Sequence, residues 1–205
     1  MSGASAPAVP RRWPESTIVC IGGGPSLTAD DVDYCRHRAP VVAINDAYRL
    51  APWADVLYAA DYQWWKWHKD AVCDFAGEKY TLQPQSTQYD PSVVVLQNTG
   101  EHGLDPDPGC LRTGRNSGVQ AINVAIHLGA VRVLLLGYDM SRAVGGPTHW
   151  FGNHPNGVVS PYATFIERFN ALPVALAALG VTVINCSRAT ALTCFPRQTI
   201  EEALP

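Results

Sequence analysis

The chain has 205 residues, a formal net charge of −3 at pH 7 and a hydrophobic content of 47%. These values are typical of a single soluble globular domain with a full core, and they argue against two domains. The weak negative charge removes the simplest argument for a nucleic-acid-binding protein, although it leaves room for a local basic groove.

The first 16 residues are mostly small residues and prolines, with Arg11 and Arg12 but no sustained apolar segment. This pattern predicts a flexible N-terminal tail over residues 1–16 and one domain over residues 17–205, with neither a signal peptide nor a membrane anchor. The six cysteines show no Cys-x-x-Cys spacing, which indicates reduced thiols in a cytoplasmic protein.

Apolar, β-branched runs recur along the chain and mostly lack the alternation of a strand with one wet face. They predict buried, mainly parallel strands at 17–21, 40–45, 55–61, 92–97, 131–137 and 181–185. Helices are expected at 117–128 and 162–179, the second interrupted at Pro173. The order strand, helix, strand predicts an α/β fold, a single Rossmann-like domain with a mainly parallel central sheet flanked by helices.

Two segments, 100–115 and 141–160, are rich in glycine and proline and are longer than ordinary connections. Loops of this length in a compact domain are usually functional, so we expect both to contribute to a site.

The stretch "CIGGGPSLT" places Gly22, Gly23 and Gly24 directly after the first predicted strand. Glycines let a ligand approach the backbone, and we expect Pro25 and Ser26 to open a helix whose first N–H groups bind a phosphate. The alternative is a tight turn without a ligand. The stretch lacks the last glycine of G-x-G-x-x-G and the Gly-Lys-Ser/Thr of a P-loop, so neither standard nucleotide motif fits.

Further polar residues follow the other predicted strands or open the helix at 117–128. Because the carboxyl ends of parallel strands share one sheet edge, we predict that these residues line a nucleotide site together. They are Asn45, Asp46, Asp61, Asn116, Ser117, Gly118, Tyr138 and Asp139. Taken singly, an Asn, Ser or Asp in such a place is better explained as a helix cap or a turn residue.

The stretch "THWFGNHP" contributes His149 and His154. No cysteine or carboxylate stands at a familiar zinc-ligand spacing from them, so we expect no metal and interpret them as candidate acid–base groups. The alternative is a surface histidine packed by Trp150. The segment "DYQWWKWH" is dense in aromatic residues, and at helical spacing we expect at least one ring to be exposed or to cover a ligand. An ordinary core helix is the favoured interpretation, and stacking on a base or sugar is the functional alternative.

With these residues in view, the chain resembles the small bacterial sialyltransferases that use CMP-sialic acid, and related nucleotide-binding proteins often found in phage genomes. The resemblance rests on "GGGPSL", "NSGVQAINVAIHLGAVRVLLLGYDM", "HWFGNHP" and "VTVINCSRATALTCF", in this order. It implies that His149 is the general base, and that the nucleotide is held by Gly23, Gly24, Ser26, Asn45, Ser117 and Gly118.

The resemblance has one clear departure. Where those enzymes keep a tyrosine that stabilises the leaving phosphate, this sequence reads "YDMSRAVGG", and we expect Arg142 to supply a positive charge there. The donor sugar therefore need not be sialic acid.

A more distant resemblance is to the archaeal-type hydroxymethyl-dihydropterin pyrophosphokinase, which uses ATP and magnesium. It implies that Asp46, Asp61 and Asp139 bind the metal ion.

The resulting hypothesis is a metal-independent glycosyltransferase-like enzyme with a nucleotide-sugar substrate and no firmly implied cofactor. The alternatives are a magnesium-dependent pyrophosphokinase or nucleotide hydrolase, and a non-catalytic phage protein that sequesters a nucleotide. The acceptor of the sugar is left open: it could be a glycan, a small molecule or modified phage DNA. The sequence also leaves open whether the protein forms a homo-oligomer. A phage-encoded protein would act in the host cytoplasm.

Overall fold

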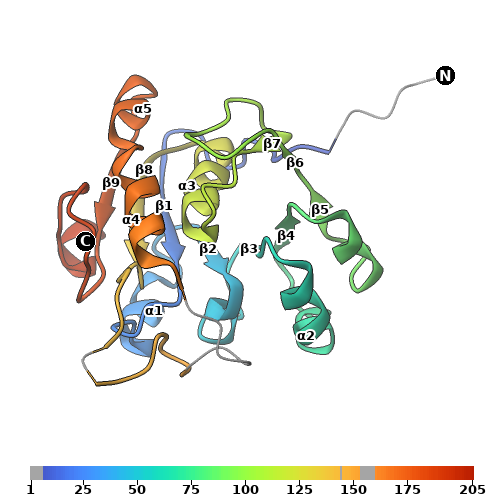
Figure 1. Ribbon diagram of the computed structural model, residues 1–205, viewed down its shortest axis with the longest axis horizontal. Helices are drawn as coiled ribbons and strands as arrows, with labels where there is room; N and C mark the ends of the chain where they lie inside the picture. Colours follow the sequence, from blue (N-terminus) through green and yellow to red (C-terminus); the bar gives the residue numbers. More distant parts are fainter. Residues whose placement is uncertain (1–6, 144, 153–159) are drawn as a thin grey trace.

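The computed structural model describes residues 7–143, 145–152 and 160–205. Its centre is a seven-stranded sheet in which all the neighbouring strands are parallel, in the order β5-β4-β3-β2-β1-β8-β9. Figure 1 shows the strands side by side from β9 at one edge to β5 at the other. The strands are β1 (Ser16–Ile21), β2 (Val41–Ile44), β3 (Val56–Tyr58), β4 (Glu78–Thr81), β5 (Val94–Val95), β8 (Ala130–Leu136) and β9 (Thr182–Asn185). The predicted α/β fold with a mainly parallel sheet is confirmed.

Helices cover both faces of this sheet. Side chains alternate between the faces of a strand, so neighbours such as Ile18 and Val19 of β1 enter different apolar clusters. One cluster includes buried residues of α3 (Ser117–Leu128), α4 (Tyr162–Asn170) and α5 (Pro173–Ala178). The other includes residues of α1 (Ala29–Cys35), α2 (Tyr62–Val72) and α6 (Ile200–Ala203). The fold is therefore a three-layer α/β/α arrangement.

The strand order reverses beside β1. The chain runs from β1 through β2, β3 and β4 to the β5 edge, and returns to β8 on the other flank of β1. At such a reversal the loops after the two central strands part and leave a crevice at their carboxyl ends, where open α/β sheets bind ligands. Here the two loops are the glycine loop, which we define as residues 22–26, and the segment that begins at Gly137.

Helix α3 is almost wholly buried, and its ends are fixed by local chemistry. The Asn116 side chain accepts hydrogen bonds from the N–H groups of Gly118 and Val119, at 2.7 and 3.3 Å, which satisfies two of the unpaired donors of the first turn. Gly129 ends the helix with a φ of 111°, a conformation that favours glycine. The start of α3 is thereby held at the carboxyl edge of the sheet.

The structure departs from the predicted elements at the β5 edge. The sequence reasoning missed β4, because "EKYT" carries two charged residues. Lys79 is buried there only because its ammonium group pairs with the Asp90 carboxylate at 2.7 Å. The run predicted as one strand at 92–97 is divided between β5 and a small second sheet, β6 (Gln97–Asn98) with β7 (Cys110–Leu111), so the 100–115 segment also contains a strand.

Two other expectations concern the chain between the strands. The break at Pro173 is confirmed, since α4 ends at Asn170 and α5 begins at Pro173. Residues 7–15, expected as part of a flexible tail, pack against the domain: Val9 is buried and its N–H donates to the Pro108 carbonyl at 2.9 Å.

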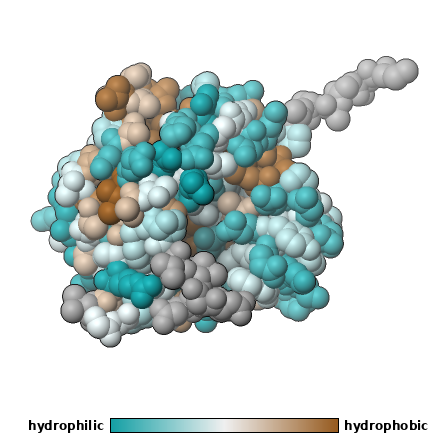
Figure 2. All heavy atoms as spheres, in the orientation of Figure 1, coloured by the Kyte–Doolittle hydropathy of each residue, from teal (hydrophilic) through white to brown (hydrophobic). Residues whose placement is uncertain are grey.

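The described surface has a local apolar feature on α5. Val174 and Leu179 are 83% and 51% exposed, and Figure 2 shows hydrophobic residues gathered over this helix. None of the described helices is long and apolar enough to cross a membrane.

Candidate functional site

A cavity of about 280 Å³ lies at the carboxyl edge of the sheet, between the glycine loop, the start of α3, residues 148–151 and the start of α4. Its size is close to the lower limit of about 300 Å³ for ligand pockets. The structure brings most of the predicted site residues together in its wall. They are Gly22, Gly23, Gly24, Asn45, Asp46, Asp61, Asn116, Ser117, Gly118, Tyr138 and His149.

Four other predicted residues do not line this nucleotide cavity, as we call it from here. Pro25, Ser26 and Asp139 are absent from its wall, as is the exposed Arg142. His154 lies outside the described residues.

The glycine loop is shaped by contacts within the protein. A Cβ on Gly22 would lie 2.8 Å from the Gly137 carbonyl oxygen, and one on Gly24 would lie 2.7 Å from the same atom and overlap the Asp139 carboxylate. A Cβ on Gly23 would meet the His149 ring at 3.2 Å. The glycines therefore allow the two loops to approach each other. This packing role explains why glycine stands at these positions, and it could not be inferred from the sequence alone.

The prediction that Pro25 and Ser26 open a helix with free N–H groups for a phosphate is wrong. Pro25 and Ser26 do not open a helix, since α1 begins at Ala29 with Thr28 as its N-cap. The N–H groups of Gly22, Gly24 and Leu27 donate to backbone carbonyls, and that of Ser26 donates to Asp139 Oδ2 at 2.8 Å. Most of the loop donors are thus already used by the protein.

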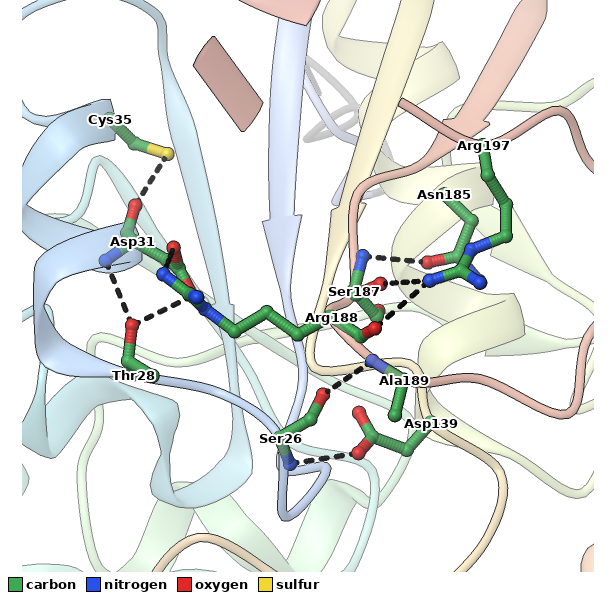
Figure 3. Close-up of polar contacts among 10 residues, drawn as sticks. All are labelled: Ser26, Thr28, Asp31, Cys35, Asp139, Asn185, Ser187, Arg188, Ala189 and Arg197. Atoms are coloured by element: carbon green, nitrogen blue, oxygen red, sulfur yellow. Dashed lines mark hydrogen bonds and ion pairs between the residues drawn. The ribbon is translucent and has the colours of Figure 1, made fainter. Parts of the chain in front are cut away.

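Ser26 and Asp139 support the loop from behind the nucleotide cavity. The Ser26 hydroxyl accepts a hydrogen bond from the Ala189 N–H at 3.2 Å, so the residue links the loop both to the end of β8 and to the segment after β9 (Figure 3). Burial raises the pKa of Asp139 above its usual value, and hydrogen bonds from Ser26 oppose this shift only in part. Asp139 is therefore a positioning group in this structure.

A bidentate ion pair ties the segment after β9 to α1. The Arg188 guanidinium donates to both carboxylate oxygens of Asp31, at 2.7 and 2.8 Å (Figure 3). Burial alone would raise the pKa of Asp31, but the hydrogen bonds from Arg188 and Thr28 outweigh it and hold the pKa below its usual value. Thr28, which caps α1, lies just beyond the glycine loop, and it also hydrogen-bonds to Asp31. The ion pair therefore joins the chain just after the glycine loop to the segment after β9.

Asn45 has a strained backbone in the wall of the nucleotide cavity. Its φ is 50°, in the left-handed region that residues with a Cβ rarely adopt. Its Oδ1 atom is buried and has no hydrogen-bond partner among the described residues. Backbone strain and a buried acceptor without a described partner make Asn45 a candidate for contact with a ligand.

Asp46, the next residue, is held by protein groups. Its carboxylate accepts from the Trp64 indole N–H at 3.0 Å and lies 3.5 Å from Arg49 and 3.6 Å from His68. Trp64 is buried, whereas Trp67 is 48% exposed, which confirms that at least one ring of the aromatic segment is exposed.

The carboxylates proposed for magnesium do not form a set of three. Asp46 faces Trp64, and Asp139 lies behind the glycine loop. Within the described part of the chain, no group of three His, Cys, Asp or Glu side chains is arranged to hold a metal ion.

His149 projects from the loop after β8 onto the glycine loop. Its Nδ1 atom lies 3.1 Å from the Gly23 carbonyl oxygen, and its ring stacks on Phe151 with centroids 4.9 Å apart and planes within 3°. A carbonyl only accepts hydrogen bonds, so Nδ1 carries a proton in this contact, and in the neutral form of the ring the lone pair lies on Nε2. An antiparallel bridge between His149 and Gly152 fixes the backbone of this loop.

The cavity residues that the sequence reasoning missed include Arg115 and Tyr162. Arg115 lines the wall at the start of α3, with its side chain exposed to solvent and a φ of 52°. Its place directly before the α3 cap was the available signal. Tyr162, at the start of α4, also lines the wall, and burial raises the pKa of its phenol while the nearby charge of Arg142 acts in the opposite direction.

No protein-family model matches the chain, and no curated protein matches it. A solved structure of the sialyltransferase CstII from Campylobacter jejuni, in complex with the substrate analogue cytidine-5'-monophosphate, is similar, with a TM-score of 0.56. The two chains are 13% identical over 90% of this chain and 85% of that one. This likeness shows that the chain shares its fold with a sialyltransferase.

Proposed function

We propose that the protein is a glycosyltransferase that moves a sugar from a nucleotide donor to an acceptor hydroxyl, with His149 as the general base. The observation that carries the proposal is the hydrogen bond from His149 Nδ1 to the Gly23 carbonyl. It sets the tautomer in which Nε2 accepts a proton, in the wall of a cavity built by the glycine loop and the start of α3.

The reaction needs one proton transfer and one substitution. Nε2 of His149 takes the proton of the acceptor hydroxyl, and the acceptor oxygen forms a bond to the anomeric carbon of the donor sugar. The bond from that carbon to the phosphate oxygen breaks, and its electron pair leaves with the nucleotide. Charge therefore develops on the phosphate, which requires nearby positive groups.

Arg115 is the group that we assign to the leaving phosphate. It lines the nucleotide cavity at the amino end of α3, where the helix dipole also favours an anion. The hydroxyl groups of Ser117 and Tyr162 lie in the same wall and can donate to phosphate oxygens. Arg142 acts at longer range, through its charge near Tyr162.

The nucleotide is proposed to be a cytidine nucleotide, because the similar solved structure holds cytidine-5'-monophosphate. Asn45, with its unsatisfied Oδ1, is placed to accept a hydrogen bond from this ligand. In the proposed complex the base and ribose lie along the glycine loop, and the phosphate lies toward Arg115.

Calorimetry with cytidine-5'-monophosphate tests the binding half of the proposal, and release of nucleotide from cytidine-monophosphate sugars tests the catalytic half. We expect His149→Asn to keep the hydrogen bond to Gly23 and the nucleotide affinity, and to lower turnover by about 10²–10⁴-fold, the usual contribution of a positioned base. Lys69→Ala, on the exposed side of α2, is the control and should match the wild type.

Three outcomes would count against the proposal. Failure of cytidine and other nucleotides to bind would remove the site. Binding without turnover would favour a nucleotide-sequestering protein, and turnover that EDTA abolishes and magnesium restores would favour a pyrophosphokinase or hydrolase.

A further inference from the structure

The loop that carries His149 has side chains on two sides. Thr148, His149 and Phe151 line the nucleotide cavity, whereas Trp150, which stands among them in the sequence, is not part of its described wall. The partly buried Trp150 ring packs instead against the apolar cluster that includes residues of α1, α2 and α6. The loop is therefore attached to the domain through a ring that faces away from the cavity.

Arg49 covers the Trp150 ring. Its Cζ atom lies 5.5 Å from the ring centroid, within the distance of about 6 Å at which a guanidinium is attracted to an indole face. The indole nitrogen Nε1 is buried and has no hydrogen-bond partner among the described residues, so the Arg49 contact is a polar interaction that this ring does make. Arg49 ends the short helix η1 (Asn45–Arg49) and is not part of the described cavity wall.

Asp46 directs the Arg49 side chain toward the loop. Its Oδ1 atom lies 3.5 Å from an Arg49 nitrogen, and its Oδ2 atom accepts from the indole N–H of Trp64, in α2, at 3.0 Å. The Arg49 side chain is 50% exposed, and an ion pair of this exposure adds little stability by itself. The contribution of the pair is to orient the guanidinium, and the contact with the Trp150 ring is what holds the loop.

The backbone of Trp150 joins His149 to the glycine loop. The Trp150 N–H donates to the Gly23 carbonyl oxygen at 3.3 Å, and the same oxygen lies 3.1 Å from Nδ1 of His149. One carbonyl thus fixes both the loop backbone and the ring that the proposed function uses as a base. A displacement of Trp150 would therefore disturb both contacts together.

We propose that Arg49 is a positioning residue for His149, which acts by holding Trp150 against the apolar cluster and so keeping Nδ1 of His149 at the Gly23 carbonyl. The role of His149 in this inference rests on the proposed function, whereas the attachment of the loop is a property of the free protein. Positioning matters because a misplacement of about 1 Å can cost about 10²-fold in rate.

Amide hydrogen exchange of the Trp150 N–H, followed by NMR in the free protein, measures the attachment directly. Arg49→Gln removes the cation, and we expect exchange to become about two- to fivefold faster, the equivalent of a cation–π contact at an exposed site. Arg49→Lys keeps a cation over the ring and should recover most of the protection. The Val19 N–H in β1 reports on the whole domain and should exchange at the same rate in all variants.

The matched control is Arg36→Gln. The Arg36 guanidinium lies 5.7 Å from the Trp53 ring, which packs against the same apolar cluster, and neither residue is in the described wall of the nucleotide cavity. Arg36→Gln therefore removes a contact of the same kind at another place, and it should leave the exchange of the Trp150 N–H unchanged.

The imidazole of His149 gives a readout that general loosening of the fold would not move. Nitrogen-15 NMR shows which ring nitrogen carries the proton, and the signal is assigned by its absence from His149→Asn. We expect the neutral wild-type ring to carry the proton on Nδ1, this form to lose population in Arg49→Gln, and Arg49→Lys to restore it. With cytidine-monophosphate sugars, Arg49→Gln should lower turnover by about twofold or more at unchanged donor KM.

The proposal is overturned if Arg49→Gln leaves the exchange of the Trp150 N–H unchanged, if Arg36→Gln accelerates it equally, or if Arg49→Lys recovers no protection. Exchange and the ring proton are measured without nucleotide, so they remain informative if the proposed function fails. Absence of nucleotide binding and turnover, with faster exchange in Arg49→Gln, would reject the proposed function and keep Arg49 as the residue that holds the loop. Turnover that depends on His149 but is unchanged in Arg49→Gln would reject this inference alone.

Discussion

At the scale of single residues, the glycine loop shows how a ligand motif can be dictated by packing. Gly24 faces Asp139 and the Gly137 carbonyl, whereas Gly23 faces the His149 ring. The glycines are required before any ligand binds, because the loops after β1 and β8 touch backbone to backbone at the point where the strand order reverses.

We therefore expect Gly24→Ala to destabilise the free protein, by about 1–3 kcal/mol, the usual cost of overpacking. Gly23→Ala should cost less stability, since its Cβ meets only the edge of a side chain at 3.2 Å. Urea unfolding without ligand measures both. Adding Asp139→Ala to Gly24→Ala should recover part of the loss, and equal stability of the two single variants would contradict this account of the loop.

Substitutions of Asn45 can separate an effect on stability from an effect on nucleotide binding. Glycine adopts a φ of 50° without the steric penalty of a Cβ, so Asn45→Gly should leave the unfolding free energy unchanged or increased. The amide that we assign to the ligand is lost, and nucleotide affinity should fall about 2–12-fold, the equivalent of one net hydrogen bond of about 0.5–1.5 kcal/mol.

Thermal unfolding and calorimetry on the same samples check this prediction. Asn45→Ala is the matched variant: it loses the same amide but must hold alanine in the left-handed region, so it should be less stable than Asn45→Gly. An Asn45→Gly protein that binds nucleotide like the wild type would show that the strain serves another purpose.

At the scale of elements, the segment after β9 holds the loops of the site in place through hydrogen bonds and an ion pair. Ser187 accepts a hydrogen bond from the Tyr138 N–H at 2.7 Å. The Ala189 N–H donates to Ser26, and Arg188 pairs with Asp31 (Figure 3). The loops after β1, β8 and β9 are thereby joined at one sheet edge, although they are far apart in the sequence.

A double-mutant cycle measures the Arg188–Asp31 link. With Asp31 buried and the contact bidentate, we expect a coupling of about 1 kcal/mol between Arg188→Ala and Asp31→Asn, at the upper end of the range for partly exposed pairs. The exposed pair Arg11–Glu15 is the control and should show about 0.2–0.5 kcal/mol. Couplings of equal size would mean that Arg188 is an ordinary surface residue.

At the scale of the whole molecule, paired carboxylates set the response to acid. Burial alone would raise the pKa values of Asp31 and Asp90, but hydrogen bonds from Arg188 and Thr28 to the first, and from Lys79 and Ser92 to the second, outweigh it and lower both. Groups with a lowered folded pKa contribute stability above their unfolded pKa of about 3.9 and lose it as the pH falls through the folded value.

The stability of the wild type should therefore decrease as the pH falls below about 4, the unfolded carboxyl pKa. Asp139 acts in the opposite sense, because its raised pKa means that the buried charge costs stability as the pH rises. Asp139→Asn keeps an acceptor for the Ser26 N–H and removes that charge, so its advantage over the wild type should grow between acid and neutral pH. Urea midpoints across this range test both slopes, and a constant difference would reject the assignment to Asp139.

The sequence by itself determined the α/β class, the parallel sheet, the break at Pro173 and half of the residues that line the nucleotide cavity. These follow from local rules: buried strands read as apolar runs, proline breaks a helix, and polar residues after parallel strands gather at one edge. The strand β4 was missed because its lysine is buried through an ion pair with a residue outside the strand.

Only the tertiary structure decided what each site residue does. Ser26 and Asp139 look like ligand groups in the sequence but support the loop, Asp46 is held by Trp64, and Arg115 enters the wall that Arg142 was expected to occupy. The physical reason is that hydrogen bonds and burial at the sheet edge depend on contacts between loops separated by a hundred residues or more, and spacing along the chain carries no record of them.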